Sequence, residues 1–239
     1  STYCIMATLI EIQTQLYQNI LLNKQLPIPT TAYPQAECGR NVEKILEDYL
    51  KETKNENNNF FPTFQNGVDI QCPWSGDWEV KTRQLGGSKS RVNIGAITTS
   101  ELDACIKYNI PFEDTDFSKY ACKHIWSFYD STYKIAKVDI WDMNTHKDIY
   151  EKAYQILLDP PATATDKYIP VSKHIIWENQ NGTSWNLRAD EKKLIKLFDG
   201  CCAKDILDKH GASITTGPIL NEVEATTYSS DKQFDTFFK

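Results

Sequence analysis

Apolar positions recur along the chain with helical spacing in several segments. In residues 41–52 the apolar side chains fall at i, i+3, i+4, i+7 and i+8, the stripe of a helix packed on a core. Similar spacing predicts helices over about 7–22, 97–110, 145–158 and 190–198, with Leu102, Cys105 and Ile106 facing inward in the second of these. Prolines at 27, 29 and 34 predict an extended connector between the first two helices.

Runs of β-branched and aromatic residues predict strands. Two such runs within 67–82 flank a Pro-Trp-Ser-Gly turn, which predicts an antiparallel hairpin. Residues 123–129 and 135–141 predict a second hairpin that extends the same sheet, and 174–177 predicts a further short strand. The predicted fold is therefore α/β (α+β), with a mixed central β-sheet flanked by helices in a single domain over residues 1–239.

The first hairpin gathers charged side chains on one face. Side chains in a strand alternate between two faces, so Glu79 and Lys81 are expected to project together while Trp78 and Val80 face the other way. If the turn lies midway between the strands, Asp69 lies opposite Glu79 or within one residue of it, and a bulge would settle the difference. Two carboxylates and one ammonium then share a small patch.

Such a patch favours a divalent metal. Like charges held side by side destabilise each other unless a cation or a proton neutralises them. Mg²⁺ typically takes one or two carboxylates, keeps several waters and completes its shell with phosphate oxygens. Asp69 and Glu79 are therefore candidate Mg²⁺ ligands, and Lys81 is a candidate to position a water or to stabilise charge on a phosphate.

This hairpin resembles a known nuclease motif. Val68-Asp69, the gap that follows and Glu79-Val80-Lys81 resemble the core of the PD-(D/E)xK nuclease superfamily, although Val68 stands where the family name has proline. The resemblance implies a restriction-endonuclease-like catalytic core over about 39–141. It leaves 142–239 for DNA recognition or dimerisation.

Within this superfamily, a stand-alone chain of this size most resembles a type II restriction endonuclease. That implies a homodimer that uses Mg²⁺ to cut both strands of double-stranded DNA at a specific short sequence. A MutH-like nicking or repair endonuclease, or another nuclease of the superfamily, is the alternative enzyme. A non-catalytic nucleic-acid or protein binding module, in which Asp69, Glu79 and Lys81 form a salt-bridged surface, is the alternative from another class.

Two further positions gain meaning from the resemblance. Nucleases of this kind often carry a glutamate on an early helix that reaches the metal site, and Gly39-x-x-x-Glu43 is similar to that pattern. Glu37 is the substitute candidate, and a capping charge near the helix N-terminus is the alternative role for Glu43. In the MutH-like branch a lysine at the head of the following strand joins the site, which makes Lys123 a candidate against an ordinary strand-end lysine.

A basic run follows the hairpin. Residues 81–91 contain four basic residues and no acidic one. Placed directly after a metal-binding strand, this run is expected to contact phosphates and bases of DNA. A solvated loop and a contact surface for an acidic protein are the alternatives. The candidate DNA-binding residues here are Arg83, Gln84, Lys89 and Arg91.

Composition narrows the class of protein. A formal net charge of −6 argues against a passive nucleic-acid binder, but less against a metal nuclease, whose acidic site is neutralised by cations. The apolar runs are too short to cross a membrane. Seven cysteines without a C-x-x-C pair, and an N-terminus without a secretory pattern, lead us to expect reduced thiols and a cytoplasmic location.

Overall fold

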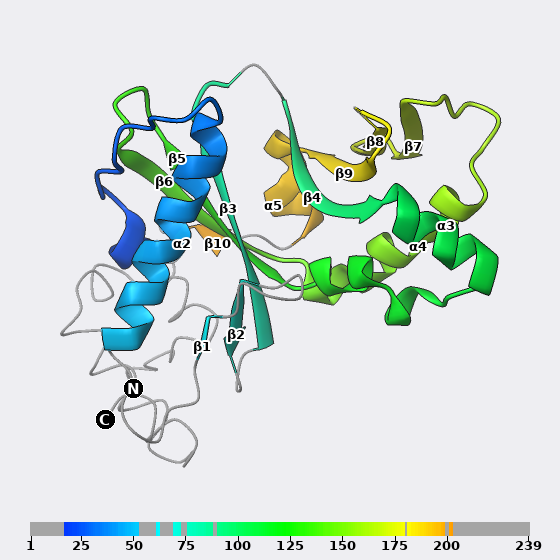
Figure 1. Cartoon of the computed structure of the whole chain (residues 1–239), viewed down its shortest axis with the longest axis horizontal. Helices are drawn as coiled ribbons and strands as arrows, with labels where there is room; N and C mark the ends of the chain where they lie inside the picture. Colours follow the sequence, from blue (N-terminus) through cyan, green and yellow to red (C-terminus); the bar gives the residue numbers. More distant parts are fainter. Residues whose placement is uncertain are drawn as a thin grey trace, which may run out of the picture.

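The computed structural model describes residues 17–52, 61–62, 69–72, 76–87, 90–179, 181–198 and 201–202. Two sheets organise them: a mixed six-stranded sheet in the order β1-β2-β3-β5-β6-β10 and an antiparallel four-stranded sheet in the order β4-β9-β8-β7 (Figure 1). The α+β class with a mixed central sheet is confirmed, and the second sheet is an addition to it. Besides the helical residues 17–21, the helices are α2 (Pro34–Glu52), α3 (Thr99–Tyr108), α4 (Lys147–Leu158) and α5 (Leu194–Leu197), with 3-10 turns η1 (Phe112–Asp114), η2 (Asp116–Tyr120), η3 (Asn144–His146) and η4 (Glu191–Lys193). The strands are β1 (Phe61–Pro62), β2 (Ile70–Cys72), β3 (Gly76–Gln84), β4 (Arg91–Thr98), β5 (Lys123–Tyr129), β6 (Ile135–Asp142), β7 (Tyr168–Ser172), β8 (Ile175–Asn179), β9 (Ser184–Asp190) and β10 (Cys201–Cys202).

Both predicted hairpins form, and they share one sheet. β2 pairs antiparallel with β3 and places Ile70 opposite Trp78 at the end of the paired segment, next to Asp69 on one strand and Glu79 on the other. β3 then pairs in parallel with β5, and β5 pairs antiparallel with β6. The strand β3 extends to Gln84, which places the start of the predicted basic loop on the sheet.

One face of this sheet is covered by α2. Val42 and Leu46 of α2 pack in a buried cluster with Trp78 and Val80 of β3 and Ile125 of β5. Figure 1 shows α2 lying across the sheet on this side. The stripe predicted for the 41–52 helix is therefore its core-facing side, and Trp78 and Val80 face away from Glu79 and Lys81, as predicted.

The N-terminal part of the same cluster comes from the end of the first predicted helix. Residues 17–21 are helical and contribute Tyr17 and Leu21 to the cluster, while the rest of the 7–22 prediction lies outside the described residues. Pro34 begins α2 instead of prolonging the connector, because a proline at the first helical position loses no intrahelical hydrogen bond.

The second sheet begins just before the helix predicted over 97–110 and takes the first two residues of that range. Residues 91–98 form β4, and α3 starts only at Thr99, with the Thr98 side chain accepting a hydrogen bond from the Glu101 N–H at 3.1 Å. Leu102 and Cys105 are buried as predicted, but the inward placement of Ile106 was wrong, because its side chain is 54% exposed. The helix turns only two apolar positions towards the core and leaves Ile106 on its outer side.

A large aromatic core joins the two sheets. Trp126 and Phe128 of β5 pack in one cluster with Trp177 of β8 and Tyr150 of α4. The Tyr150 hydroxyl donates to the Ile94 carbonyl at 3.0 Å, which ties α4 to β4. Because Trp126 neighbours Lys81 in the β3–β5 register, the face of β3 that carries Glu79 and Lys81 is turned to the side of the second sheet.

The remaining predictions hold with small changes. The helix predicted over 145–158 is η3 followed by α4, the strand at 174–177 is β8, and the helix over 190–198 is divided into η4 and α5. No helix in the described part of the chain is long and apolar enough to cross a membrane.

Candidate active site

The site is built on the first half of β3. Asp69 lies just before β2, and its carboxylate accepts a hydrogen bond from the Val80 N–H at 2.7 Å. β2 pairs with β3 only as far as Trp78, so the Asp69 side chain, and not a β2 carbonyl, is the hydrogen-bond partner of the Val80 N–H. The contact fixes the Asp69 carboxylate beside the strand position of Glu79.

Glu79 and Lys81 project from β3 on one face, as predicted. The Lys81 ammonium donates to a carboxylate oxygen of Glu79, and the Glu79 side chain is only 7% exposed. Lys81 is also close to Tyr120 of η2, with its Nζ 5.6 Å from the centre of the ring. The ammonium is thus held between the strand and η2.

The carboxyl groups are held where their charges are unfavourable. Burial raises the pKa of Glu79 to about 7, with the charge of Asp69 adding to the rise and Lys81 opposing it. Burial also raises the pKa of Asp69, against the hydrogen bond from Val80 and the charge of Lys81. Burial by itself lowers the pKa of Lys81, but Glu79 outweighs it and the pKa is raised.

Helix α2 brings a third carboxyl group to the same place. Burial raises the pKa of Glu43 to about 7, and the charges of Asp69 and Glu79 raise it while that of Lys81 lowers it. Such mutual effects require proximity. The structure therefore brings together all four residues that the sequence marked as candidate catalytic residues.

Glu37, the substitute candidate for Glu43, has a different role. Its carboxylate accepts hydrogen bonds from the backbone N–H groups of Thr30 and Thr31, both at 3.1 Å. These contacts hold the segment that leads into α2. Glu37 thus lies in the first turn of α2 and bonds the connector before it, whereas Glu43 lies beside the carboxyl groups of the site.

Sequence reasoning missed two neighbours of the site. The Tyr120 side chain lies near the carboxyl groups, and its pKa is raised by burial, with Lys81 lowering it and Glu79 and Asp69 raising it. His124 of β5 is fully buried; its Nε2–H donates to the Tyr120 carbonyl at 2.9 Å, and burial lowers its pKa to about 3. No local pattern marks either residue, because only the packing of η2 and β5 against β3 brings them close.

The donor set suits a magnesium ion with few protein ligands. Among the described residues no group of three or more His, Cys, Asp and Glu side chains is arranged to hold a metal ion. Mg²⁺ needs only one or two carboxylates because it keeps several waters. Asp69 and Glu79 meet that requirement, and a divalent cation between them would favour their charged forms, which burial disfavours.

A cavity of about 590 Å³ opens next to Lys81. Three of the predicted DNA-binding residues, Arg83, Gln84 and Arg91, line it. Lys89, the fourth, lies outside the described residues. None of the described residues that line this cavity is acidic, so it presents a cationic surface beside the carboxyl groups.

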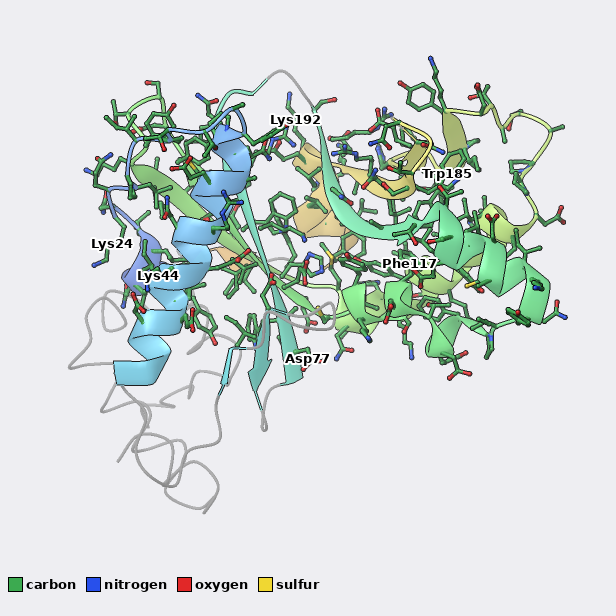
Figure 2. The ribbon with its side chains drawn as sticks, in the orientation of Figure 1. Lys24, Lys44, Asp77, Phe117, Trp185 and Lys192 are labelled. Carbon is green, nitrogen blue, oxygen red and sulfur yellow. The ribbon has the colours of Figure 1, made fainter. Side chains whose placement is uncertain are left out.

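Lys123 lies elsewhere. The β3–β5 register sets it beside Trp78 and sets His124 beside Glu79, and its Nζ lies 5.5 Å from the centre of a Trp78 ring. It lines a separate cavity of about 230 Å³ together with Asp77, which Figure 2 labels near the start of β3. The structure thus turns Lys123 to the opposite face of the sheet from Lys81 and does not bring it to the site.

Comparison with known proteins adds no relative. The chain matches no protein-family model and no curated protein.

Proposed function

We propose that this chain is a Mg²⁺-dependent endonuclease of the PD-(D/E)xK superfamily that hydrolyses phosphodiester bonds of double-stranded DNA at a specific short sequence. The observation that carries the proposal is the convergence of Glu43, Asp69 and Glu79 with the ammonium of Lys81. These groups come from α2, the start of β2 and the middle of β3, and the two glutamates have pKa values of about 7. Buried carboxyl groups with raised pKa values are frequent at catalytic sites.

Each residue has a role that follows from its position. Asp69 and Glu79 would hold Mg²⁺, which when bound supplies a Lewis acid and lowers the pKa of a coordinated water. Lys81 donates hydrogen bonds, so it can orient the attacking water or stabilise the negative charge that develops on the phosphate. Glu43, with a pKa of about 7, can accept or give up a proton near neutral pH.

The cationic cavity supports DNA as the substrate. Lys81 belongs both to the carboxyl cluster and to the cavity that Arg83 and Arg91 line, so a phosphate bound in the cavity lies next to the reacting groups. Binding to DNA is driven largely by contacts to phosphates. A local cationic surface serves this purpose despite the net charge of −6.

We propose that the active form is a cytoplasmic homodimer. Each chain contributes one such site, and one site cuts one strand. A symmetric pair would place two sites on the two strands of a palindromic sequence.

The test is cleavage of supercoiled plasmid and phage DNA by the full chain, with Mg²⁺ and with EDTA. Asp69→Asn, Glu79→Gln and Lys81→Ala are expected to lower the rate by roughly 100-fold or more, as losses of charge stabilisation at a reacting phosphate do. Asp48→Asn is the matched control, because Asp48 is an exposed carboxylate of α2 that pairs with Lys44. It should cut like the wild type.

The products distinguish the alternatives. Discrete fragments that require Mg²⁺ support a double-strand cutter, whereas nicked circles point to a MutH-like enzyme. DNA left intact by the wild type with both Mg²⁺ and Mn²⁺ would contradict the nuclease proposal, and Asp69, Glu79 and Lys81 would then belong to the surface of a binding module.

A further inference from the structure

The second sheet forms the outer wall of the cavity beside Lys81. Asn93 of β4 and Arg188 of β9 face each other in the register of the two strands, and both line the cavity. Their neighbours Leu187 and Ala189 are fully buried in the aromatic core. This sheet therefore has one apolar face that packs on the core and one polar face that continues the cavity.

Arg188 is held in place from behind. Its side chain is 15% exposed, and its Nε lies 2.9 Å from a carboxylate oxygen of Glu178 on β8. This ion pair and the low exposure of the side chain restrain the guanidinium, so less conformational entropy is lost when it binds a ligand. An arginine positioned in this way can donate two parallel hydrogen bonds to one acceptor pair.

Asn93 is fixed as well. Its amide nitrogen donates to the Asn186 side chain at 3.1 Å, and its amide oxygen accepts from the Gly95 N–H at 3.1 Å. The polar face of β4 and β9 thus carries side chains with defined orientations. Amide and guanidinium groups are the groups that discriminate base edges in DNA.

The opposite wall of the cavity suits phosphate. Arg83 follows Lys81 by two residues on β3, so the two cations lie on the same face of the strand. Arg83 is anchored by donation from Nη1 to the Arg91 carbonyl at 2.9 Å and by Glu191, 3.6 Å away. The cavity therefore has a cationic wall next to the reacting groups and a polar wall farther from them.

From this division, and resting on the proposed nuclease function, we infer that the polar face of β4 and β9 reads base edges beside the scissile bond. Arg188 and Asn93 are the specificity-determining residues, and Arg83 contacts the backbone. Arg188 is the natural partner of guanine, which presents two acceptors to a guanidinium.

The test reads the sequence at the cut ends. Phage DNA is digested with the wild type, Arg188→Lys, Arg188→Ala and Arg83→Ala, and the ends are sequenced. Loss of a bidentate arginine should lower discrimination at one base position by about ten-fold to a hundred-fold. Arg83→Ala should slow cutting at all sequences alike. Arg188→Lys keeps the positive charge facing Glu178, so a change in sequence preference in this variant is not caused by loss of the ion pair. Melting curves check that each variant is folded.

Lys107→Ala is the control, because it removes one positive charge from α3, away from the cavity. It should keep the wild-type preference. If both Arg188 variants give ends with the wild-type sequence, the base-reading role is overturned while the nuclease remains. If the wild type produces no ends at all, the nuclease proposal fails and the reading surface fails with it.

Discussion

Glu79 is a carboxyl group kept where its charge is costly. Its pKa rises from 4.5 to about 7 on folding, chiefly through burial. Because the folded pKa exceeds the unfolded one, the folded chain binds the proton more tightly between these values. The contribution of Glu79 to the free energy of unfolding is therefore most favourable below about pH 4.5 and is lost as the pH rises through about 7.

The first prediction follows from that sign. In EDTA, the melting temperature of the wild type should fall relative to that of Glu79→Gln as the pH rises from about 5 to about 8, because the glutamine carries no charge to bury. Calorimetric melting of both proteins over this range measures the difference. Asp48→Asn should melt in parallel with the wild type, and a wild-type difference from Glu79→Gln that stays constant with pH would contradict the prediction.

The binding of Mg²⁺ should have the opposite pH dependence to the stability of the metal-free protein and should strengthen as the pH rises. Mg²⁺ needs ionised ligands, so at a pH near 7 its binding to the site must displace a proton from Glu79. We expect the affinity for Mg²⁺ to increase from pH 6 to pH 8, with proton release on binding. Titration calorimetry in two buffers of different ionisation enthalpy counts the protons. Glu79→Gln should bind Mg²⁺ more weakly and release fewer protons, and equal values for the two proteins would refute this role.

Two glutamates on one helix allow a matched comparison. Glu43→Gln should lower the cutting rate with little loss of stability, because it removes a charge that the site disfavours when it is empty of cations. Glu37→Ala should lower the melting temperature and leave the rate unchanged, because it removes the acceptor for the N–H groups of Thr30 and Thr31. Rates and melting curves for both variants decide the matter, and the reverse assignment would place Glu37 at the site.

At the scale of single residues, sequence patterns identify the site residues that the local geometry of a strand or helix brings together. The alternation of β3 and the short turn set Asp69, Glu79 and Lys81 together, and the periodicity of α2 set Glu43 beside its core-facing stripe. Residues that reach the site through packing alone have no such signal. Tyr120 and Arg188 come from segments that lie far along the chain, and only the tertiary structure brings them beside Lys81.

Among the elements, β4 and η2 are in close contact at a glycine. A side chain at Gly95 would place its Cβ 2.9 Å from a ring carbon of Phe117 and 3.3 Å from Tyr120. Phe117, labelled in Figure 2, is fully buried in the aromatic core and has little room to move. Gly95 therefore allows η2 to pack on β4 and to hold Tyr120 over Lys81.

Gly95→Ala should destabilise the protein by about 1–3 kcal/mol through overpacking. It should also slow cutting, because a shift of η2 moves Tyr120 away from Lys81. The control is Gly39→Ala in α2, where nothing lies within 4 Å of the added Cβ. That change should stabilise the protein by about 0.5–1 kcal/mol, since glycine is unfavourable inside a helix. Denaturant unfolding of both variants tests this contrast, and a neutral Gly95→Ala would show that η2 adapts.

Three of the four strands of the second sheet escaped prediction, for reasons visible in those strands. A bulge between Asn93 and Gly95 interrupts the alternation of β4, so its apolar positions do not follow a period of two. Pro170 lies within β7, and prolines in a run of residues argue against a strand unless it is an edge, which β7 is in the described sheet. The β5–β6 hairpin has its own irregularity between Phe128 and Tyr129, but it lies at the end of β5, so most of the strand keeps an uninterrupted pattern and was predicted.

The molecule as a whole separates its charges. The chain carries 26 basic and 32 acidic residues, yet the described lining of the cavity beside Lys81 contains cations and no carboxylate. In Figure 1, β3 lies between α2 on one side and the second sheet on the other. The carboxyl cluster and the cationic cavity therefore meet at Lys81 of β3, and DNA is expected to enter the cavity, which residues of α2 and of the second sheet also line.

Salt dependence of binding measures that arrangement. Each phosphate neutralised by a protein cation contributes about −0.9 to the slope of log K against log salt. In a Glu79→Gln background, expected not to cut, Arg83→Gln should reduce the slope for a short duplex by about 1, because its anchored guanidinium leaves the phosphate wall. Lys107→Gln makes the same change in net charge on α3 and should leave the slope unchanged. Equal slopes for the two variants would mean that the overall charge, and not the cavity beside Lys81, sets the affinity for DNA.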